Sequence, residues 1–278
     1  VAYLCLFWLA MDMFNTRVAL VTGGNRGIGL EVVRIILEET TPHTVFLGCR
    51  DLEAGQALVK SLCESFGDRV EAIQLDVTNS ESLRLAAELV ARKTNGRLDI
   101  LVNNAGILLE GDGKAFTMEA ARETLLVNLE GVVAATEAFL PLLKASSGPA
   151  KIIFTSSSQG NRTLGLLGEE HRKALMDPLL DVARLRELMV GLVEGLSNPN
   201  NSYHSIPTVA YGLSKMAVNS FTQIMARAYP EMAFNACSPG FCNTDMCANY
   251  TGQRKPKEPA LGASVFQKVL FGELGGST

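Results

Sequence analysis

Short apolar runs alternate along the chain with longer stretches in which apolar residues recur at helical spacing. Such alternation predicts strands joined by helices, and therefore a parallel sheet with helices on both faces. The predicted strands are 17–21, 44–47, 70–75, 99–102, 151–154 and 233–236. The predicted helices are 27–39, 51–66, 80–94, a long one ending at Leu143, 209–228 and one ending near Phe271. We expect a single α/β domain built on a doubly wound sheet.

The segment 160–206 interrupts this alternation. It contains a helical pattern over 177–196, with Pro178 suited to a first helical turn, and turn residues follow from Asn198. The segment lies between a predicted strand and the next main helix, where α/β folds place active-site loops. We expect a domain over 15–278 in which 160–206 is a helical insertion.

Residues 1–14 precede the first predicted strand. The opening stretch VAYLCLFWLAM is apolar but too short to span a bilayer, and it has neither the basic leader nor the cleavage site of a signal peptide. We interpret residues 1–14 as an N-terminal extension. An artefact of the gene model is favoured over the remnant of an anchor.

The composition narrows the classes of function. Hydrophobic residues make up 47% and charged residues 19% of the 278 residues, which predicts a large core and excludes global disorder. The net charge is −4 without long runs of one sign, so no nucleic-acid surface is predicted. The six cysteines lack the spacing of a zinc site and favour free thiols in a reducing compartment. We expect a cytoplasmic protein without metal, nucleic-acid or membrane partners.

A glycine-rich turn follows the first predicted strand and opens a helix. The residues Thr22-Gly-Gly-Asn-Arg-Gly-Ile-Gly29 are spaced as G-x-x-x-G-x-G. Glycines let the backbone approach a pyrophosphate, and the helix N-terminus stabilises its charge. Tight turns also require glycine for conformational reasons alone. The position inside a βαβ unit favours a dinucleotide site.

The end of the second strand distinguishes the two nicotinamide cofactors. Asp51 would bind the ribose of NAD, or it would cap the following helix, and we favour the cap. Arg50 then stands at the strand tip, and Arg26 adds a second cation from the glycine loop. Two guanidinium groups without a competing acid favour NADP(H). The alternative is a pair of solvated surface arginines.

Tyr211 and Lys215 lie four residues apart, on one face of a predicted helix. A free phenol has a pKa of about 10 and gives up its proton slowly at neutral pH. An ammonium group beside it would stabilise the phenolate and lower the pKa of the tyrosine. The spacing alone also fits an ordinary helix edge with a packed ring and a solvated lysine.

Several further motifs occur in one order along the chain. They are Asp76-Val77, Asn103-Asn104-Ala105-Gly106, Val127-Asn128, Ser156-Ser157, Ser238-Pro239-Gly240 and Thr244-Asp245-Met246. With the glycine loop and the Tyr-Lys pair, they make the chain resemble the short-chain dehydrogenase/reductases from residue 17 to about 247. Within that family the chain is most similar to the monomeric carbonyl reductases, because a long segment separates Ser157 from Tyr211. This resemblance implies a Rossmann-type fold and a monomer, because the insertion of relatives covers the face used elsewhere for oligomers.

The resemblance implies an NADPH-dependent reductase that transfers hydride to the carbonyl of a ketone, aldehyde or quinone. Tyr211 would donate the proton, Lys215 would support it and hold the nicotinamide ribose, and Ser157 would bind the substrate oxygen. Asn128 would organise a water chain that resupplies the proton. The implied cofactor contacts are Gly23, Asn25, Arg26, Gly27, Ile28, Gly29, Arg50, Asp76, Val77, Asn104, Ala105, Gly106, Tyr211, Lys215, Pro239, Gly240, Cys242 and Thr244.

Two features of the implied site are particular to this chain. Cys242 replaces the family's usual valine or isoleucine, and a thiol near the nicotinamide would make the enzyme sensitive to oxidation. An apolar wall of the substrate pocket is expected from Leu164, Leu166, Leu167, Met246 and Tyr250.

Two other functions remain open on the sequence. One is a catalytically silent NADP-sensing or scaffold protein on the same fold, which a lost Tyr or Lys would have favoured. The other is an NAD(P)+-dependent alcohol dehydrogenase, the reverse reaction, against which Arg26 and Arg50 argue.

Overall fold

The computed structural model describes residues 16–111, 116–206, 208–248, 250 and 252–272. The predicted N-terminal extension, residues 1–14, lies outside the described residues.

The core of the fold is a six-stranded, wholly parallel sheet. The strand order is β3-β2-β1-β4-β5-β6. The strands are β1 (Arg17–Thr22), β2 (His43–Cys49), β3 (Val70–Gln74), β4 (Ile100–Asn103), β5 (Lys151–Thr155) and β6 (Ala233–Cys237). From β1 the next strands in sequence, β2 and β3, lie to one side, and β4 to β6 lie to the other. Doubly wound folds bind ligands at this switch in strand order, outside the carboxyl ends of the strands.

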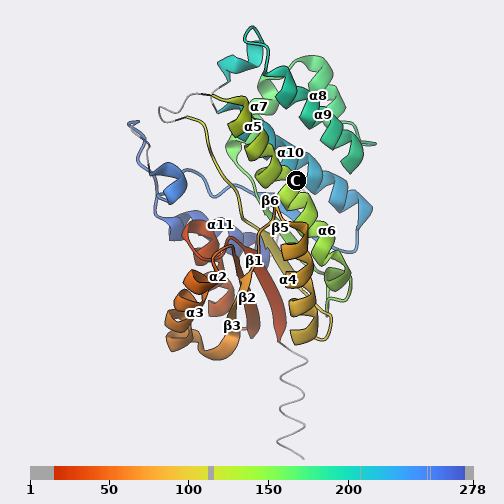
Figure 1. Cartoon of the computed structure of the whole chain (residues 1–278). Coiled ribbons are helices and arrows are strands. Elements are labelled where there is room, and N and C mark those ends of the chain that lie inside the picture. The colour runs from red at the N-terminus through yellow and green to blue at the C-terminus, as the bar shows by residue number, and fades with distance from the viewer. Residues whose placement is uncertain (1–15, 112–115, 207, 249, 251, 273–278) are drawn as a thin grey trace, which may run out of the picture.

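Helices cover both faces of the sheet, as Figure 1 shows. One face carries α2 (Gly27–Glu38), α3 (Leu52–Phe66) and α11 (Pro259–Phe271), which share a core with alternate strand residues such as Ala19 and Val21. The other face carries α4 (Ser80–Lys93), α5 (Met118–Leu125), the π-helical segment η2 (Leu126–Glu130), α6 (Gly131–Lys144) and α10 (Val209–Ala228). Val18 and Leu20 point to this second core. Burial on both faces explains why the strands are continuous apolar runs.

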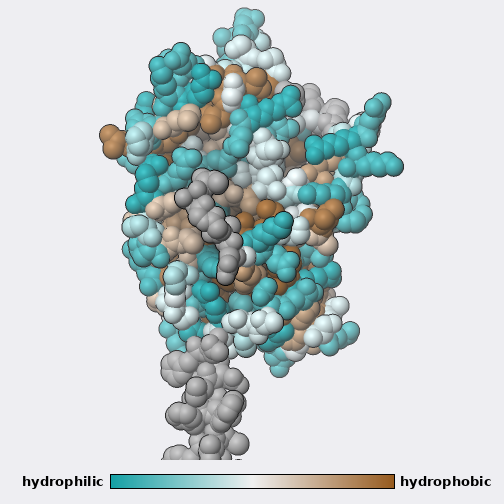
Figure 2. Space-filling model, turned by 180° about the vertical axis from the view of Figure 1, so that it is seen from behind, coloured by the Kyte–Doolittle hydropathy of each residue, from teal (hydrophilic) through white to brown (hydrophobic). Residues whose placement is uncertain are grey.

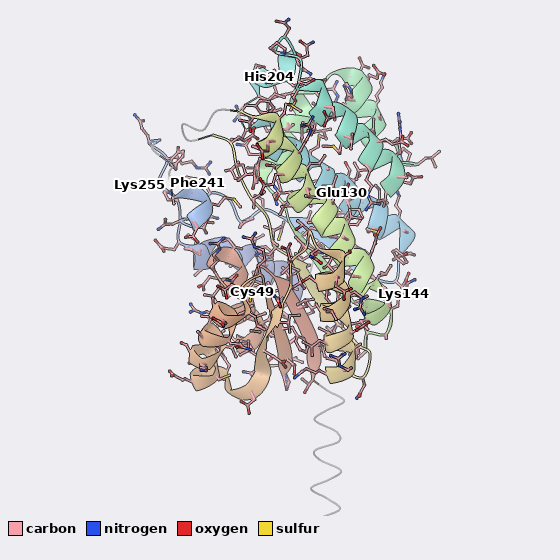
Figure 3. The ribbon with its side chains drawn as sticks, viewed as in Figure 1. Cys49, Glu130, Lys144, His204, Phe241 and Lys255 are labelled. Carbon is pink, nitrogen blue, oxygen red and sulfur yellow. The ribbon has the colours of Figure 1, made fainter. Side chains whose placement is uncertain are left out.

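The helix η2–α6 lies along the second face of the sheet. Glu130 and Lys144 mark the two ends of α6 in Figure 3, and the Glu130 end lies toward the carboxyl ends of the strands. The continuous helical run Met118–Lys144 is long and apolar enough to cross a membrane, the single such run in the described part of the chain. Half of the most apolar part of this run is buried inside the protein, as is common for the core helix of a soluble protein. The run is therefore weak evidence for a membrane span.

The insertion forms α7 (Ser158–Leu166), α8 (Glu169–Leu175), α9 (Val182–Gly195) and the short 3-10 helix η3 (Ser202–Ser205). The helix predicted over 177–196 is present as α9, but it begins at Val182, so the prediction of Pro178 in its first turn is wrong. Asp181 caps α9 by accepting a hydrogen bond from the backbone N–H of Arg184 at 2.8 Å. Asp177 instead closes a turn, because its side chain accepts from the backbone N–H of Leu179 at 2.8 Å. Of two acids able to cap, the second starts the helix.

α9 packs against α5 and α10, and it therefore covers part of the second face of the molecule. Two short 3-10 helices, η1 (Gly67–Arg69) and η4 (Asp245–Cys247), complete the elements. Seen from behind in Figure 2, hydrophilic residues cover much of the surface, with smaller apolar areas between them. The five cysteines in the described residues are free thiols, as predicted for them.

Candidate active site

The glycine loop requires glycine at defined positions. Gly23 and Gly27 have φ of 62° and 52°, in the region that disfavours side chains. A Cβ at Gly29 would overlap the carbonyl oxygen of Gly23, so the first turn of α2 lies directly against the loop. Arg26, the N-cap residue of α2, makes no capping hydrogen bond with its side chain. The backbone thus forms a cradle with the helix N-terminus facing it, which fits the pyrophosphate of a dinucleotide.

Asn104 connects the ends of three strands at this cradle. Its Nδ2 donates to the carbonyl oxygens of Thr22 and Gly23 at 3.1 and 3.2 Å, and its Oδ1 accepts from Oγ1 of Thr155 at 3.4 Å. Thr22 Oγ1 in turn accepts from the backbone N–H groups of Asn104 and Ala105, both at 3.0 Å. β1, β4 and β5 are therefore held in register at their carboxyl ends. The role of Thr155 was not predicted.

The two predicted phosphate-binding arginines are both on the surface. Arg50 is exposed at the tip of β2, and Asp51 caps α3 by accepting from the backbone N–H of Ala54 at 3.0 Å, as predicted. Arg26 Nη1 lies 2.8 Å from Oδ2 of Asp245. This ion pair of Arg26 was not predicted from the sequence. Sequence spacing could not show this, because Asp245 comes from the far end of the chain.

The loop after β6 closes over the glycine loop. A Cβ at Gly27 would stand 3.1 Å from Cγ2 of Thr244, so the two loops touch. Gly240 takes a φ of 78°, and Asn243 and Lys257 extend the loop by a backbone hydrogen bond of 2.8 Å. Figure 3 shows Phe241 and Lys255 on this segment. Pro239, Gly240, Cys242 and Thr244 thus lie on a loop that reaches the cofactor cradle.

Tyr211, Lys215 and Ser157 meet at the ends of β5 and α10. The phenol of Tyr211 is hydrogen-bonded to the side chain of Ser157. Lys215 Nζ donates to the carbonyl oxygen of Thr155 at 2.7 Å and lies 5.7 Å from the centre of the Tyr211 ring. Ser156 points elsewhere, with its Oγ donating to Oδ1 of Asn219 at 2.6 Å. The structure therefore brings Ser157, and not Ser156, to the tyrosine.

Burial controls the charge of this pair. It raises the pKa of Tyr211 to about 12, while the hydrogen bond with Ser157 acts in the opposite direction. Burial also lowers the pKa of Lys215 to about 8. The pKa of Tyr211 is therefore raised and not lowered as expected, because loss of solvent outweighs the hydrogen bond with Ser157. At neutral pH Tyr211 is a protonated phenol, which suits a proton donor.

Asn128 is fully buried in the π-helical segment η2. Its Oδ1 accepts from the backbone N–H of Ile107 at 2.8 Å, and its Nδ2 donates to the Ile107 carbonyl at 2.9 Å and to Oγ of Ser214 at 3.1 Å. Asn128 thus ties the loop after β4 to α10. π-helical turns recur at functional sites, and spacing counted for an α-helix does not reveal them. A water chain at Asn128 stays a prediction.

Asp76 and Val77 follow β3, on the other side of the cradle. Asp76 Oδ1 accepts from the backbone N–H and Oγ1 of Thr78 at 2.9 and 2.7 Å, which fixes the turn. Val77 is buried, and a Cβ at Gly131 would meet its side chain at 2.7 Å. Both residues lie where a chain leaves the carboxyl edge of the sheet. Their contact with adenine stays a prediction.

Cys242 does not have the properties of an oxidation-sensitive thiol. It is buried beneath α11, and its Sγ donates weakly to the carbonyl oxygens of Pro239 and Gly240 at 3.4 and 3.6 Å. Burial raises the pKa of the Cys242 thiol. Thiolate is the reactive form of cysteine, so the raised pKa argues against the oxidation sensitivity, which stays a prediction.

The predicted apolar wall is also only partly formed. Leu167 is buried in the core and cannot line a pocket, whereas Leu166 and Met246 are exposed. Leu164 is half-buried against the core. The ring of Tyr250 packs edge-on against Phe241, with the ring centres 4.6 Å apart.

Glu110 was missed by sequence reasoning. It accepts a hydrogen bond from the backbone N–H of Tyr211 at 2.7 Å. The available signal was a single acid following the apolar residues Ile107, Leu108 and Leu109.

The known proteins to which this chain is similar belong to the family that its motifs indicate. The family model described as short chain dehydrogenase matches residues 17–167. The chain is 34% identical over 258 residues to carbonyl reductase (NADPH) 1 of Sus scrofa, covering 90% of this chain and 86% of that protein. It is 34% identical over 257 residues to (+)-neomenthol dehydrogenase of Arabidopsis thaliana, covering 83% and 84%. The solved structure of salutaridine reductase from Papaver somniferum has a TM-score of 0.80 and 29% identity, covering 94% of this chain and 98% of that one.

No cluster of side chains in the described residues could hold a metal ion.

Proposed function

The chain belongs to the short-chain dehydrogenase family, and we propose that it is an NADPH-dependent reductase of a ketone, aldehyde or quinone carbonyl. One observation carries the proposal. The phenol of Tyr211 is hydrogen-bonded to Ser157 and lies beside Lys215, at the same sheet edge as the glycine cradle. Relatives similar over most of their length are named as NADPH carbonyl reductases, which supports the cofactor and the reaction class.

The site residues would divide the chemistry between them. Bound NADPH supplies the hydride. Ser157 and Tyr211 orient the substrate carbonyl through hydrogen bonds to its oxygen. Tyr211 transfers its O–H proton to the alkoxide oxygen, and the ammonium of Lys215 offsets the negative charge left on the phenolate. Asn128 holds the loop that faces this pair through its hydrogen bonds to Ile107, and it would organise the water chain that resupplies the proton.

Cofactor recognition would fall to the cradle and the neighbouring loops. The backbone of Gly23–Gly29 would bind the pyrophosphate, and Arg26 and Arg50 the 2′-phosphate. Asp76 and Val77 would face adenine. The loop from Asn104 to Gly106 would face the ribose, and the loop from Pro239 to Thr244 the nicotinamide. The intact Tyr211 and Lys215 give no support to a silent sensor, and the two arginines argue against an NAD(P)+-dependent alcohol dehydrogenase.

We also propose a monomeric, cytoplasmic enzyme. α9 packs on α5 and α10, which supports a covered face instead of an oligomer interface. The free thiols of the described residues support a reducing compartment. Light scattering of the purified protein should give the mass of one chain, and the mass of two would reject the monomer.

The reaction is tested by oxidation of NADPH or NADH, followed by absorbance, against a panel of cyclic ketones, quinones and aldehydes. We expect turnover of at least one carbonyl class, with a lower KM for NADPH than for NADH. Preference for NADH would reject the cofactor assignment. Tight NADPH binding without turnover of any carbonyl would favour the sensor.

A further inference from the structure

A buried carboxylate, that of Glu110, meets the first turn of the catalytic helix α10. Glu110 lies in the loop after β4 and is almost fully buried. It accepts from the backbone N–H of Tyr211 at 2.7 Å and also from the backbone N–H of Ala210. The first amides of a helix have no partner within the helix. One side chain, distant in sequence, therefore serves two of these amides.

Thr208, the residue before α10, does not make a capping contact with its side chain. Thr208 precedes α10 but has a left-handed backbone, with φ of 50°, and its side chain makes no capping hydrogen bond. A threonine that caps a helix normally has an extended backbone. Gly111, with φ of 83°, turns the loop toward this point, where a Cβ would press on Cγ2 of Thr208 at 2.8 Å. Glu110 thus takes the place of a local cap.

The same loop is fixed at both ends to the candidate site. At its start Asn104 is bonded to the glycine cradle, and its middle residue, Ile107, is held by Asn128. Its far end reaches the backbone of Tyr211 through Glu110. The short, hydrogen-bonded backbone segment from Asn104 to Glu110 therefore fixes the position of Tyr211 relative to the glycine cradle.

Resting on the proposed role of Tyr211 as proton donor, we propose that Glu110 is a positioning residue that places the Tyr211 phenol relative to the cofactor cradle. Its negative charge is favourable at a helix N-terminus. Burial raises the pKa of Glu110, while the bonds from Tyr211 and Ala210 act in the opposite direction. Either protonation state retains an oxygen that accepts from these amides.

Removal of the Glu110 carboxylate should lower kcat and leave the affinity for NADPH unchanged. Removing the carboxylate leaves two amides unpaired in a buried site, which favours a shift or fraying of the first turn of α10. A displacement of about 1 Å in a reacting group costs up to about a hundredfold in rate. The residues proposed to bind the 2′-phosphate and pyrophosphate lie on other loops, so NADPH affinity should persist.

The experiment compares Glu110→Ala, Glu110→Gln and the exposed control Glu123→Ala in the full chain. For Glu110→Ala we expect kcat to fall at least about tenfold, with the NADPH dissociation constant within about twofold of wild type. Glu110→Gln keeps an acceptor oxygen and should stay within about threefold of the wild-type kcat. Glu123→Ala should match wild type. A folded Glu110→Ala with wild-type kcat, or a Glu110→Gln as slow as Glu110→Ala, would overturn the proposal.

Hydrogen exchange of the peptide that contains Ala210 and Tyr211 supplies a readout that needs no substrate. We expect the protection of these amides to fall in Glu110→Ala and to persist in Glu110→Gln; unchanged protection in Glu110→Ala contradicts the proposal. If Glu110→Ala does not fold, Glu110→Asp replaces it, since the shorter side chain should give an intermediate kcat, and a wild-type value overturns the proposal. A wild type that reduces no carbonyl but shows the exchange pattern would reject the proposed function and leave the capping contact supported.

Discussion

The proposed catalytic group (Asn128, Ser157, Tyr211 and Lys215) and the two arginines proposed to bind phosphate, Arg26 and Arg50, differ in how the protein holds them. Lys215 is 3% exposed and donates to a strand carbonyl, and Asn128 makes three hydrogen bonds in the core. The side chain of Arg26 is 66% exposed and makes one ion pair with Asp245. Exposed ion pairs contribute only about 0–1 kcal/mol. The proposed catalytic group is therefore held in place by the protein itself, whereas the exposed arginines proposed to bind phosphate can rearrange. Substitutions in the two groups should affect different kinetic constants.

The largest effect is expected from Tyr211→Phe. Loss of the phenol proton removes general acid catalysis, which should lower kcat by about a thousandfold or more. The NADPH dissociation constant, measured by fluorescence titration, should stay within about twofold. Tyr229→Phe, at the end of the same helix, is the matched control and should keep wild-type kcat. A Tyr211→Phe enzyme with normal turnover would mean that the buried group is structural.

A smaller effect, on the other side of the comparison, is expected from Arg26→Ala. A charge-assisted hydrogen bond to phosphate contributes about 1.5–3 kcal/mol, so KM for NADPH should rise by about ten- to a hundredfold. KM for NADH and kcat should change less than about threefold. Arg34→Ala removes an arginine of the same helix, paired with Glu31, and should change neither constant. An equal loss with NADPH and NADH would show that Arg26 does not read the 2′-phosphate.

The buried group should also impose a pH dependence. The pKa of Lys215 is lowered to about 8, so its ammonium is lost as the pH rises through that value, while Tyr211, with a pKa of about 12, stays protonated. We expect kcat/KM for NADPH to fall about tenfold per pH unit above pH 8. A profile that stays flat up to pH 10 contradicts this assignment.

The free energy of unfolding should rise above pH 8, where kcat/KM is expected to fall. An unfolded lysine keeps its proton up to about pH 10.4, so between pH 8 and that value the unfolded state binds more protons at this site. The contribution of Lys215 to the free energy of unfolding therefore rises with pH. Thermal unfolding of wild type and Lys215→Met, measured across this pH range, distinguishes activity lost with the ammonium charge from activity lost by unfolding.

The smallest effect is expected from Asp245→Asn, which releases Arg26 from its ion pair. Because the pair is exposed and weak, KM for NADPH should fall by only about two- to fivefold, with KM for NADH unchanged. Glu31→Gln, which releases Arg34 in the same helix, is the control. A higher KM for NADPH in Asp245→Asn would show that Asp245 orders Arg26 for the phosphate instead of competing with it.

The sequence predicted features that depend on local pattern. The strands were recognisable because both faces of the sheet are buried, and Asp51 was recognisable as a cap because a carboxylate precedes a periodic helix. The resemblance to the short-chain dehydrogenase/reductases pointed to Ser157, the serine that meets Tyr211 in the structure. Such features are set by residues close together in the chain.

Features set by distant contacts were missed. The ion pair of Arg26 with Asp245 and the cap from Glu110 join residues far apart in the sequence. The pKa of Tyr211 depends on its burial, which a four-residue spacing does not reveal. Pro178 suited a first helical turn, but α9 begins only after the cap Asp181, a start that was not predicted.

The central claim is that this protein transfers hydride from NADPH to a carbonyl carbon with Tyr211 as the acid. The most direct test uses NADPH dideuterated at C4 of the nicotinamide with a ketone that wild type consumes, and mass spectrometry of the alcohol formed. We predict one deuterium on the former carbonyl carbon with wild type and no alcohol above background with Tyr211→Phe. NADPH binding without deuterated alcohol from any carbonyl, or equal deuterium transfer by Tyr211→Phe, would contradict the claim.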